Sequence, residues 1–300
     1  MLQRTLKSEV RLIGVGLHSG ERVNLSLSPL GESEGVQFLR TDLEKAHIPI
    51  KLDPYLINDT RLSSTIVTRA GIKIGTIEHL MSALCALGID NILITLDGPE
   101  IPIMDGSSLS FIHVMQEVGI QEQRKEKTFL RIKKPIRIEE GDKEVELVPY
   151  EGFKIKLTID FEHPVFKKAL SSLEIDFSKV SYIEEIARAR TFGFMHEIEF
   201  MRSHQLGLGG NLSNAIVVSD TDVLNVEGLR YPDEFVRHKI LDAIGDLYVI
   251  GYPVIGYFKG YKSGHAINNA LLRKLLEDKN NYEKVTFVHD QKLPNAFHHL

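Results

Sequence analysis

The sequence holds a single cysteine, Cys85, among its 300 residues. One cysteine excludes an intramolecular disulfide and a multi-cysteine metal cluster. It also favours a reducing compartment, so we expect a cytoplasmic protein. Any metal site must therefore use other ligands, and the chain offers 12 histidines beside 41 aspartates and glutamates.

Long apolar runs and a large charge excess are absent as well. No stretch approaches the ~20 apolar residues of a membrane-spanning helix, and the first residues lack the apolar core of a signal peptide. The 36 lysines and arginines against 41 acidic residues leave a net charge of −5. This balance gives no reason to expect a nucleic acid partner. We therefore expect a soluble protein with no integral membrane segment.

The order of periodic segments predicts an α+β fold in two halves of similar plan. Alternating apolar and polar residues predict strands at 10–17, 22–29, 35–40, 129–132, 137–139, 144–149 and 154–160. Helices are expected to follow the strands in each half, at about 76–87 and at about 232–250. Because the chain is long enough for two domains, we expect domains at 1–126 and 127–300, each with a mostly antiparallel sheet packed on helices.

Two stretches depart from this regular pattern. Residues 122–127 are a charge run, which we expect to be a solvated surface and to contain the linker between the halves. Residues 193–214 interleave apolar side chains with Gly207, Gly209 and Gly210, and we expect irregular structure there.

The segment 238–246 carries the strongest local signal. His238, Asp242 and Asp246 are spaced four residues apart, so on a helix they form one stripe with neighbours ~6 Å apart. A histidine and an aspartate one turn apart can place a ring nitrogen and a carboxylate oxygen on the same metal ion. On spacing alone, a solvated helix face with incidental charges remains an alternative.

Glu78 and His79 open an otherwise apolar helix. Adjacent helical residues point about 100° apart, so they can flank an ion more readily than bind it together. His79 could bind the metal while Glu78 acts as general base on a water molecule. The alternative is that Glu78 only favours the helix N-terminus and His79 is a core histidine. A third histidine, His265, stands at a predicted helix start, where a capping or surface role is the alternative.

Together these residues complete a catalytic centre. A catalytic zinc ion needs three protein ligands and one open position, and His79, His238 and Asp242 supply that set. Glu78 and His265 are then left for acid and base roles. Asp246 could hold the His265 ring and raise its pKa, as a carboxylate beside an imidazolium does.

At this point the sequence resembles the UDP-3-O-acyl-N-acetylglucosamine deacetylases, the zinc amidases of lipid A synthesis. The resemblance rests on motifs that run in order along nearly the whole chain. They are GVGLHSG (14–20), TIEHL (76–80), GIDNI (88–92), PEIPIMDGS (99–107), RTFG (190–193), HKILDAIGD (238–246) and GH (264–265).

The resemblance implies hydrolysis of the acetamide of an acylated UDP-N-acetylglucosamine, at an active site between two α+β domains. It implies one zinc ion held by His79, His238 and Asp242. It also implies that Glu78 is the general base and that His265 is its protonated partner. Asp246 then supports His265.

The remaining expectations come from the resemblance alone. It assigns Thr191 to hydrogen bonding with the developing oxyanion, Lys239 to the diphosphate or sugar, and Phe192 to the sugar face. Phe161 and Glu197 are assigned to the nucleotide end. An insert at about 193–217 is expected to form a passage for the fatty acyl chain.

Two other classes of function stay open at this stage. A non-catalytic protein that binds nucleotide sugars or lipids would not need the metal ligand set. A zinc peptidase would use a His-x-x-x-His pair, whereas no second histidine follows His79 one turn later, because positions 82 and 83 are Ser and Ala.

Overall fold

The computed structural model describes residues 1–44, 48–288 and 293–297. The first half contains a five-stranded sheet in the order β2-β3-β9-β4-β5. Its strands are β2 (Val10–Val15), β3 (Arg22–Pro29), β9 (Ile92–Leu96), β4 (Val36–Arg40) and β5 (Ile50–Lys51). β4 runs parallel to β9 and the other neighbours are antiparallel. The period-2 alternation seen in the sequence explains β3, whose Val23, Leu25 and Leu27 face the core.

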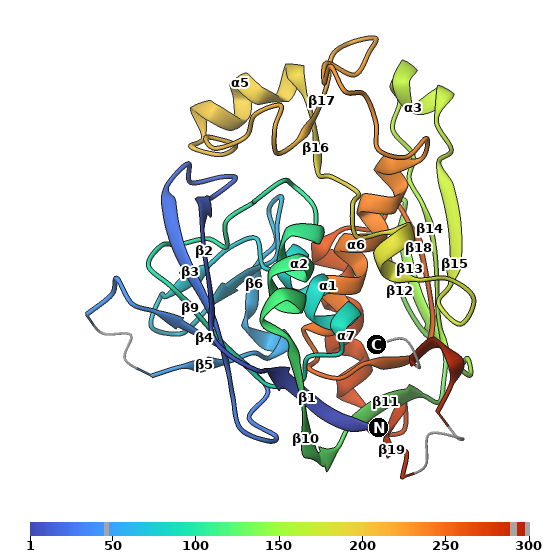
Figure 1. Ribbon diagram of the computed structural model, residues 1–300. Helices are drawn as coiled ribbons and strands as arrows, with labels where there is room; N and C mark the ends of the chain where they lie inside the picture. The colour runs from blue at the N-terminus through green and yellow to red at the C-terminus, as the bar shows by residue number, and fades with distance from the viewer. Residues whose placement is uncertain (45–47, 289–292, 298–300) are drawn as a thin grey trace.

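Two helices of the first half lie between this sheet and the second half of the molecule (Figure 1). They are α1 (Glu78–Leu87) and α2 (Leu109–Val118). α1 ends at Gly88, which adopts a left-handed conformation with φ 61°. Residues with a side chain adopt this conformation less readily than glycine. Smaller elements complete this half: the pair β1 (Leu2–Leu6) and β10 (Ile120–Glu126), the short helix η1 (Pro54–Leu56), and the sheet of β6 (Ile57–Asp59), β7 (Thr65–Val67) and β8 (Lys73–Ile74).

The second half contains a seven-stranded sheet. Five of its strands lie in the order β12 (Ile136–Glu140), β13 (Lys143–Val148), β18 (Val254–Tyr261), β11 (Thr128–Ile132) and β19 (Tyr282–Thr286). In addition, β14 (Phe153–Thr158) pairs with β18, and β15 (Ser172–Asp176) pairs with β14. The helices α6 (Glu234–Tyr248) and α7 (His265–Glu277) pack against this sheet. Short helices are α3 (Pro164–Lys168), α4 (Tyr182–Glu185) and η3 (Asn295–Phe297).

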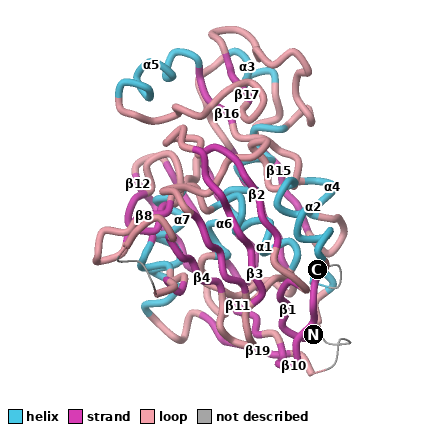
Figure 2. The backbone as a smooth tube through the Cα atoms, turned by 60° about the vertical axis from the view of Figure 1, so that its left-hand side comes forward, coloured by secondary structure: helices cyan, strands magenta, loops and turns pink. Residues whose placement is uncertain are grey.

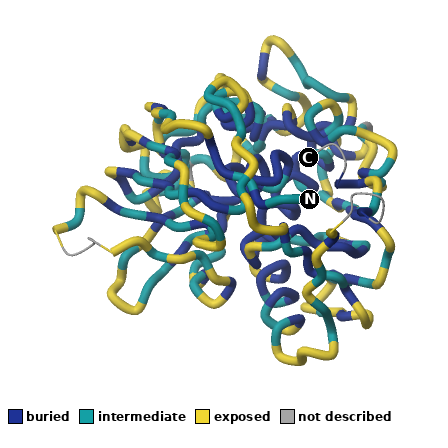
Figure 3. Tube along the Cα trace, turned by 60° about the horizontal axis from the view of Figure 1, so that its bottom comes forward, coloured by how far each residue is buried: buried dark blue, intermediate teal, exposed yellow. Residues whose placement is uncertain are grey.

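The predicted fold class is confirmed: two mostly antiparallel sheets pack on helices. The sheet of the second half is mixed, however, because β18 pairs in parallel with both β11 and β14. Figure 3 shows the buried chain gathered in the middle of the molecule and the exposed chain around it. Among the described residues, no helix combines the length and apolarity needed to cross a membrane.

Two local predictions hold only in part. The stretch 193–214 is not simply irregular, since β16 (Phe192–Phe194) leads into helix α5 (Met195–Ser203), and β17 (Ile216–Val218) pairs in parallel with β16. Figure 2 shows these elements at one end of the molecule, beyond the two main sheets. The charge run 122–127 is solvated at residues 122 and 124–126, as expected, but residues 122–126 belong to strand β10, and the following Lys127 is fully buried. Pairing with β1 outweighs the low strand propensity of charged residues.

Helices α1 and α6 form the contact between the halves that matters most for the site. Gly245 of α6 lies against the backbone of Glu78, and a Cβ atom at this position would overlap the Glu78 carbonyl oxygen. The absence of a side chain therefore lets the two helices approach closely. As a result, Asp242 and Asp246, on either side of Gly245, face the first turn of α1.

Candidate active site and metal centre

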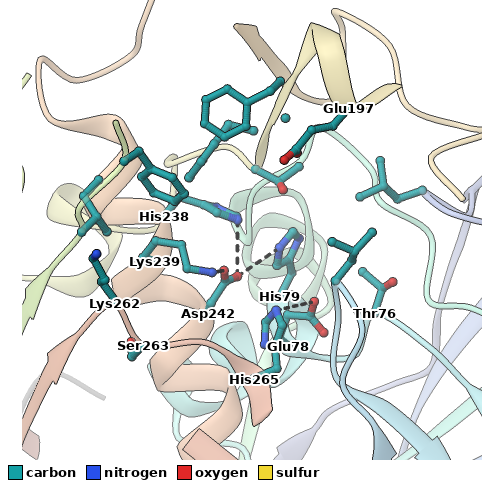
Figure 4. Close-up of a pocket in the computed structure, with 18 of the residues that line it drawn as sticks. Thr76, Glu78, His79, Glu197, His238, Lys239, Asp242, Lys262, Ser263 and His265 are labelled. Atoms are coloured by element: carbon teal, nitrogen blue, oxygen red, sulfur yellow. Dashed lines mark hydrogen bonds and ion pairs between the residues drawn. The ribbon is translucent and has the colours of Figure 1, made fainter. Parts of the chain in front are cut away.

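Three buried side chains converge where α1 meets α6. His79, His238 and Asp242 each offer one ligand atom, and these atoms lie within 4.8 Å of one another. Asp242 Oδ1 is 3.4 Å from His79 Nε2 and 3.3 Å from His238 Nε2 (Figure 4). The two rings are nearly perpendicular, with centroids 4.9 Å apart. Two imidazoles and a carboxylate therefore point to one spot.

The surroundings prepare these groups for a cation. Nδ1 of His238 lies 3.0 Å from the carbonyl oxygen of Ala189, and a ring that donates its proton there leaves Nε2 free as a ligand. Burial lowers the pKa of His238 to about 3 even though Asp242 opposes the shift, so this ring is neutral. Burial alone would raise the pKa of Asp242, but His238 and Lys239 hold it well below its usual range.

The residues fit a divalent metal ion. Asp242 Oδ1 is buried and has no hydrogen-bond partner within the described chain. A buried charged oxygen without a partner is costly, whereas an ion between this oxygen and the two Nε2 atoms would satisfy it. Two neutral imidazoles with one carboxylate form a donor set suited to zinc-like metals.

A second group of titratable side chains adjoins the ligands. His265, the first residue of α7, places Nδ1 2.9 Å from Asp246 Oδ2 and Nε2 3.6 Å from Glu78 Oε1. Burial alone would lower the pKa of His265, but Asp246 and Glu78 raise it to about 9. Burial raises the pKa of Glu78, opposed by His265 and His79. The structure thus places a carboxylate with a raised pKa next to a protonated imidazole.

Lys239 and Thr191 border the metal ligands. The Nζ of Lys239 donates to Asp242 Oδ2 at 2.8 Å, so this cation contacts a ligand residue as well as the cavity. The backbone of Thr191 is fixed on both sides, because its N–H donates to Gly106 and its carbonyl accepts from Ile216, each at 2.8 Å. Gly106 and Thr191 come from different halves of the chain.

The three metal ligands face one cavity of about 390 Å³, together with Glu78, His265, Lys239 and Thr191. Phe161, Phe192 and Glu197 also line it, and the ring of Phe161 lies 5.8 Å from that of Phe192, edge to face. A smaller cavity of about 150 Å³ shares part of this lining and extends along α5 and the loop that contains Gly207 and Gly210. Most of its lining is apolar or glycine, with Leu17, Leu62, Ile198, Met201, Gly207, Gly210 and Val217, and its polar members include His18, Glu197 and Asn211. Every residue selected from the sequence except Asp246 lines the main cavity, and Asp246 contacts it through His265.

Sequence reasoning missed two partners of the acid and base groups. Asn268 donates to Asp246 Oδ2 at 2.9 Å, and its position one turn after His265 could have indicated this. Ser64 donates its hydroxyl to Asp246 Oδ1 at 2.6 Å and its backbone N–H to Glu78 Oε2 at 3.0 Å. No sequence signal connects Ser64 to Asp246, because 182 positions separate them.

Comparison with known proteins identifies the family. Residues 3–277 match the family described as UDP-3-O-acyl N-acetylglycosamine deacetylase. The chain belongs to this family. The resemblance drawn from the seven motifs is thereby confirmed.

Curated members of the deacetylase family match over nearly their full length. Proteins named UDP-3-O-acyl-N-acetylglucosamine deacetylase from Neisseria meningitidis (strain Z2491) and Neisseria gonorrhoeae are each 64% identical over 301 residues, covering 100% of this chain and 98% of the relative. One from Chromobacterium violaceum is 55% identical over 300 residues with the same coverage. The alignments with these relatives therefore cover the whole chain.

Proposed function

We propose that this protein hydrolyses the acetamide of UDP-3-O-acyl-N-acetylglucosamine, giving UDP-3-O-acyl-glucosamine and acetate, an early step of lipid A synthesis. One observation carries the proposal: three potential metal ligands, a general base candidate and a cationic imidazole meet at one cavity. The full-length match to proteins named for this substrate supports it. In the reaction, water adds to the carbonyl carbon, the C–N bond breaks, and the nitrogen leaves as the sugar amine.

The proposed cofactor is one zinc ion per chain, held by His79, His238 and Asp242. Bound zinc lowers the pKa of a water ligand toward ~7 and polarises a carbonyl oxygen. The protein prepares this site through the neutral His238 ring, oriented by Ala189, and through the ionised Asp242 carboxylate.

The proton steps are proposed for Glu78 and His265. Glu78 takes a proton from the attacking water, and its raised pKa makes it a stronger base than an exposed glutamate. The oxyanion that develops accepts a hydrogen bond from the Thr191 hydroxyl and faces the charged His265 ring. One such donor is typically worth about 3–4 kcal/mol. The leaving nitrogen receives its proton from His265 or back from Glu78, while Asp246 keeps the His265 ring charged.

The sugar, the nucleotide and the acyl chain of the substrate are proposed to occupy the two cavities. The sugar lies against Phe192, with Lys239 at the diphosphate or sugar and with Phe161 and Glu197 toward the nucleotide. The acyl chain enters the smaller cavity bounded by the insert at about 193–217. This lining supports the assignment, because aliphatic side chains and glycine backbone suit a hydrocarbon chain.

Two organisational points belong to the same proposal. The domain boundary is proposed at 126/127, supported by the end of β10 at Glu126 and by the start of the second sheet with β11 at Thr128. The proposed location is the cytoplasm. Its support is the single cysteine, since a reducing compartment suits a chain without disulfides.

An assay on the acylated UDP-N-acetylglucosamine tests the function directly. We expect acetate release that stops when a chelator removes the metal and returns with added zinc, and purified protein with about one zinc per chain. Substrate binding without acetate release would favour a non-catalytic binding protein. Hydrolysis that is indifferent to chelation would overturn the metal proposal.

A further inference from the structure

Ser64 joins the two carboxylates that flank the His265 ring. It directly precedes β7 and is 2% exposed. Its backbone N–H donates to Glu78 Oε2 at 3.0 Å, and its hydroxyl donates to Asp246 Oδ1 at 2.6 Å. Its carbonyl accepts from Ile77, the residue before Glu78, at 3.2 Å. One small residue therefore contacts the start of α1 and a side chain of α6.

We propose that Ser64 is a positioning residue, which sets the distance between the general base Glu78 and the Asp246–His265 pair. This inference rests on the function proposed above. His265 lies between the carboxylates, 2.9 Å from Asp246 and 3.6 Å from Glu78. A change in the separation of the carboxylates would therefore move the ring relative to the reacting atoms.

The other partners of Asp246 do not perform this task. His265 and Asn268 both belong to α7, so their hydrogen bonds to Asp246 tie α7 to α6. Within the described chain, the hydroxyl of Ser64 is the hydrogen bond that ties Asp246 to the half carrying Glu78. A hydrogen bond to a buried carboxylate is stronger than one between neutral groups, and the serine side chain has little freedom to move when it is buried. These two properties suit a fixed spacer.

The neighbouring serine provides a matched control. Ser63 is 4% exposed, and its Oγ lies 3.4 Å from Thr65 Oγ1. Within the described part of the chain it makes no hydrogen bond to Glu78, Asp246 or His265. Ser63→Ala and Ser64→Ala therefore remove the same atom from the same buried turn. Only the second change removes a contact with the acid and base groups.

The test compares steady-state kinetics of the wild type, Ser63→Ala, Ser64→Ala and Ser64→Thr, each with its zinc content and thermal midpoint. Ser64→Ala should lower kcat about 10-fold, the lower end of what loss of a supporting hydrogen bond costs, with KM and zinc content unchanged. Ser63→Ala should stay near the wild type, and Ser64→Thr should regain most of kcat because it keeps the hydroxyl. If Ser64→Ala does not fold, Ser64→Cys, whose thiol is a weak donor, should show the same kcat loss.

A double-mutant cycle with Asp246→Ala separates positioning from packing. Once the carboxylate is gone, Ser64→Ala should lower kcat no further, whereas a packing defect would cost the same in both backgrounds. Equal kcat values for Ser63→Ala and Ser64→Ala would overturn the proposal, and so would an unchanged loss in the Asp246→Ala background. An inactive wild type would instead contradict the proposed function, so the two failures can be told apart.

Discussion

Charged side chains are buried near both ends of helix α1, and the two ends differ in whether the buried polar atoms have hydrogen-bond partners. At its C-terminal end, Lys127 is completely buried and donates at 2.6 Å to both the carbonyl of Gly88 and the carboxylate of Asp90. At its N-terminal end, Glu78 and His79 are also buried, each 3% exposed, yet neighbouring Asp242 Oδ1 has no hydrogen-bond partner in the described part of the chain.

This difference distinguishes a buried charge that stabilises the fold from buried charges that are available to an ion or a substrate. A lysine at a helix C-terminus complements the helix dipole, and its partners satisfy it within the protein. Burial lowers the pKa of Lys127, and Asp90 opposes the shift. At the other end, the ligand atoms converge without satisfying one another, which leaves room for an ion and a substrate. We therefore expect loss of the base at one end to lower the rate without changing stability, and loss of Lys127 at the other end to lower stability without changing the rate.

The largest effect is expected from Glu78→Gln. The amide keeps the shape of the side chain but cannot accept the proton of the attacking water. We expect kcat to fall by about 10²–10⁴-fold, the usual contribution of a general base. Zinc content and thermal midpoint should stay close to those of the wild type, and near-normal turnover would exclude Glu78 as the base.

At the opposite end, Lys127→Met should act on stability. The change leaves the carboxylate of Asp90, whose side chain is 12% exposed, without its cation, and breaking a buried pair in this way costs about 3–5 kcal/mol. We expect a lower urea midpoint, with kcat per folded molecule unchanged. Lys125→Met, a change at an exposed position of the same charge run, is the control. A loss of kcat with normal stability would mean that the two ends are coupled.

Removing the metal should destabilise only the N-terminal end of α1. An ion that binds the folded chain adds stability according to its concentration over its Kd, about 4 kcal/mol at 1,000 times Kd. Chelation should therefore lower the thermal midpoint of the wild type and increase amide exchange around His79 and His238. Asp242→Ala should show a much smaller response to the chelator. An identical response in this variant would place the stabilising ion elsewhere.

The same comparison shows what the sequence could predict. The ligand stripe of α6 was visible because His238, Asp242 and Asp246 obey a local helical spacing. The burial of Lys127 was not visible, because its partner Gly88 is 39 positions away and the surrounding charges suggested a solvated linker. Ser64 was missed for the same reason. Local periodicity can be read from a single chain, whereas pairing across the fold depends on tertiary contacts such as the close approach at Gly245.

The smallest effect is a shift in the pH profile, and it tests the Asp246–His265 pair. The general base must be ionised, so the rate should fall at low pH as Glu78 is protonated, starting higher than for an exposed glutamate because burial raises its pKa. The acid must be protonated, so the rate should fall again as pH rises through about 9, where His265 loses its proton.

Asp246→Asn should move this basic limb to lower pH, because a neutral amide no longer stabilises the imidazolium. Rates measured from pH 5 to 10 would show the shift, and the limb should disappear from the residual rate of His265→Ala. A basic limb that disappears in His265→Ala but stays in place in Asp246→Asn would contradict this expectation. The pKa of His265 would then be set by Glu78 rather than by Asp246, and the link from Ser64 through Asp246 to the reacting atoms would have to act on the position of the ring, without changing its charge.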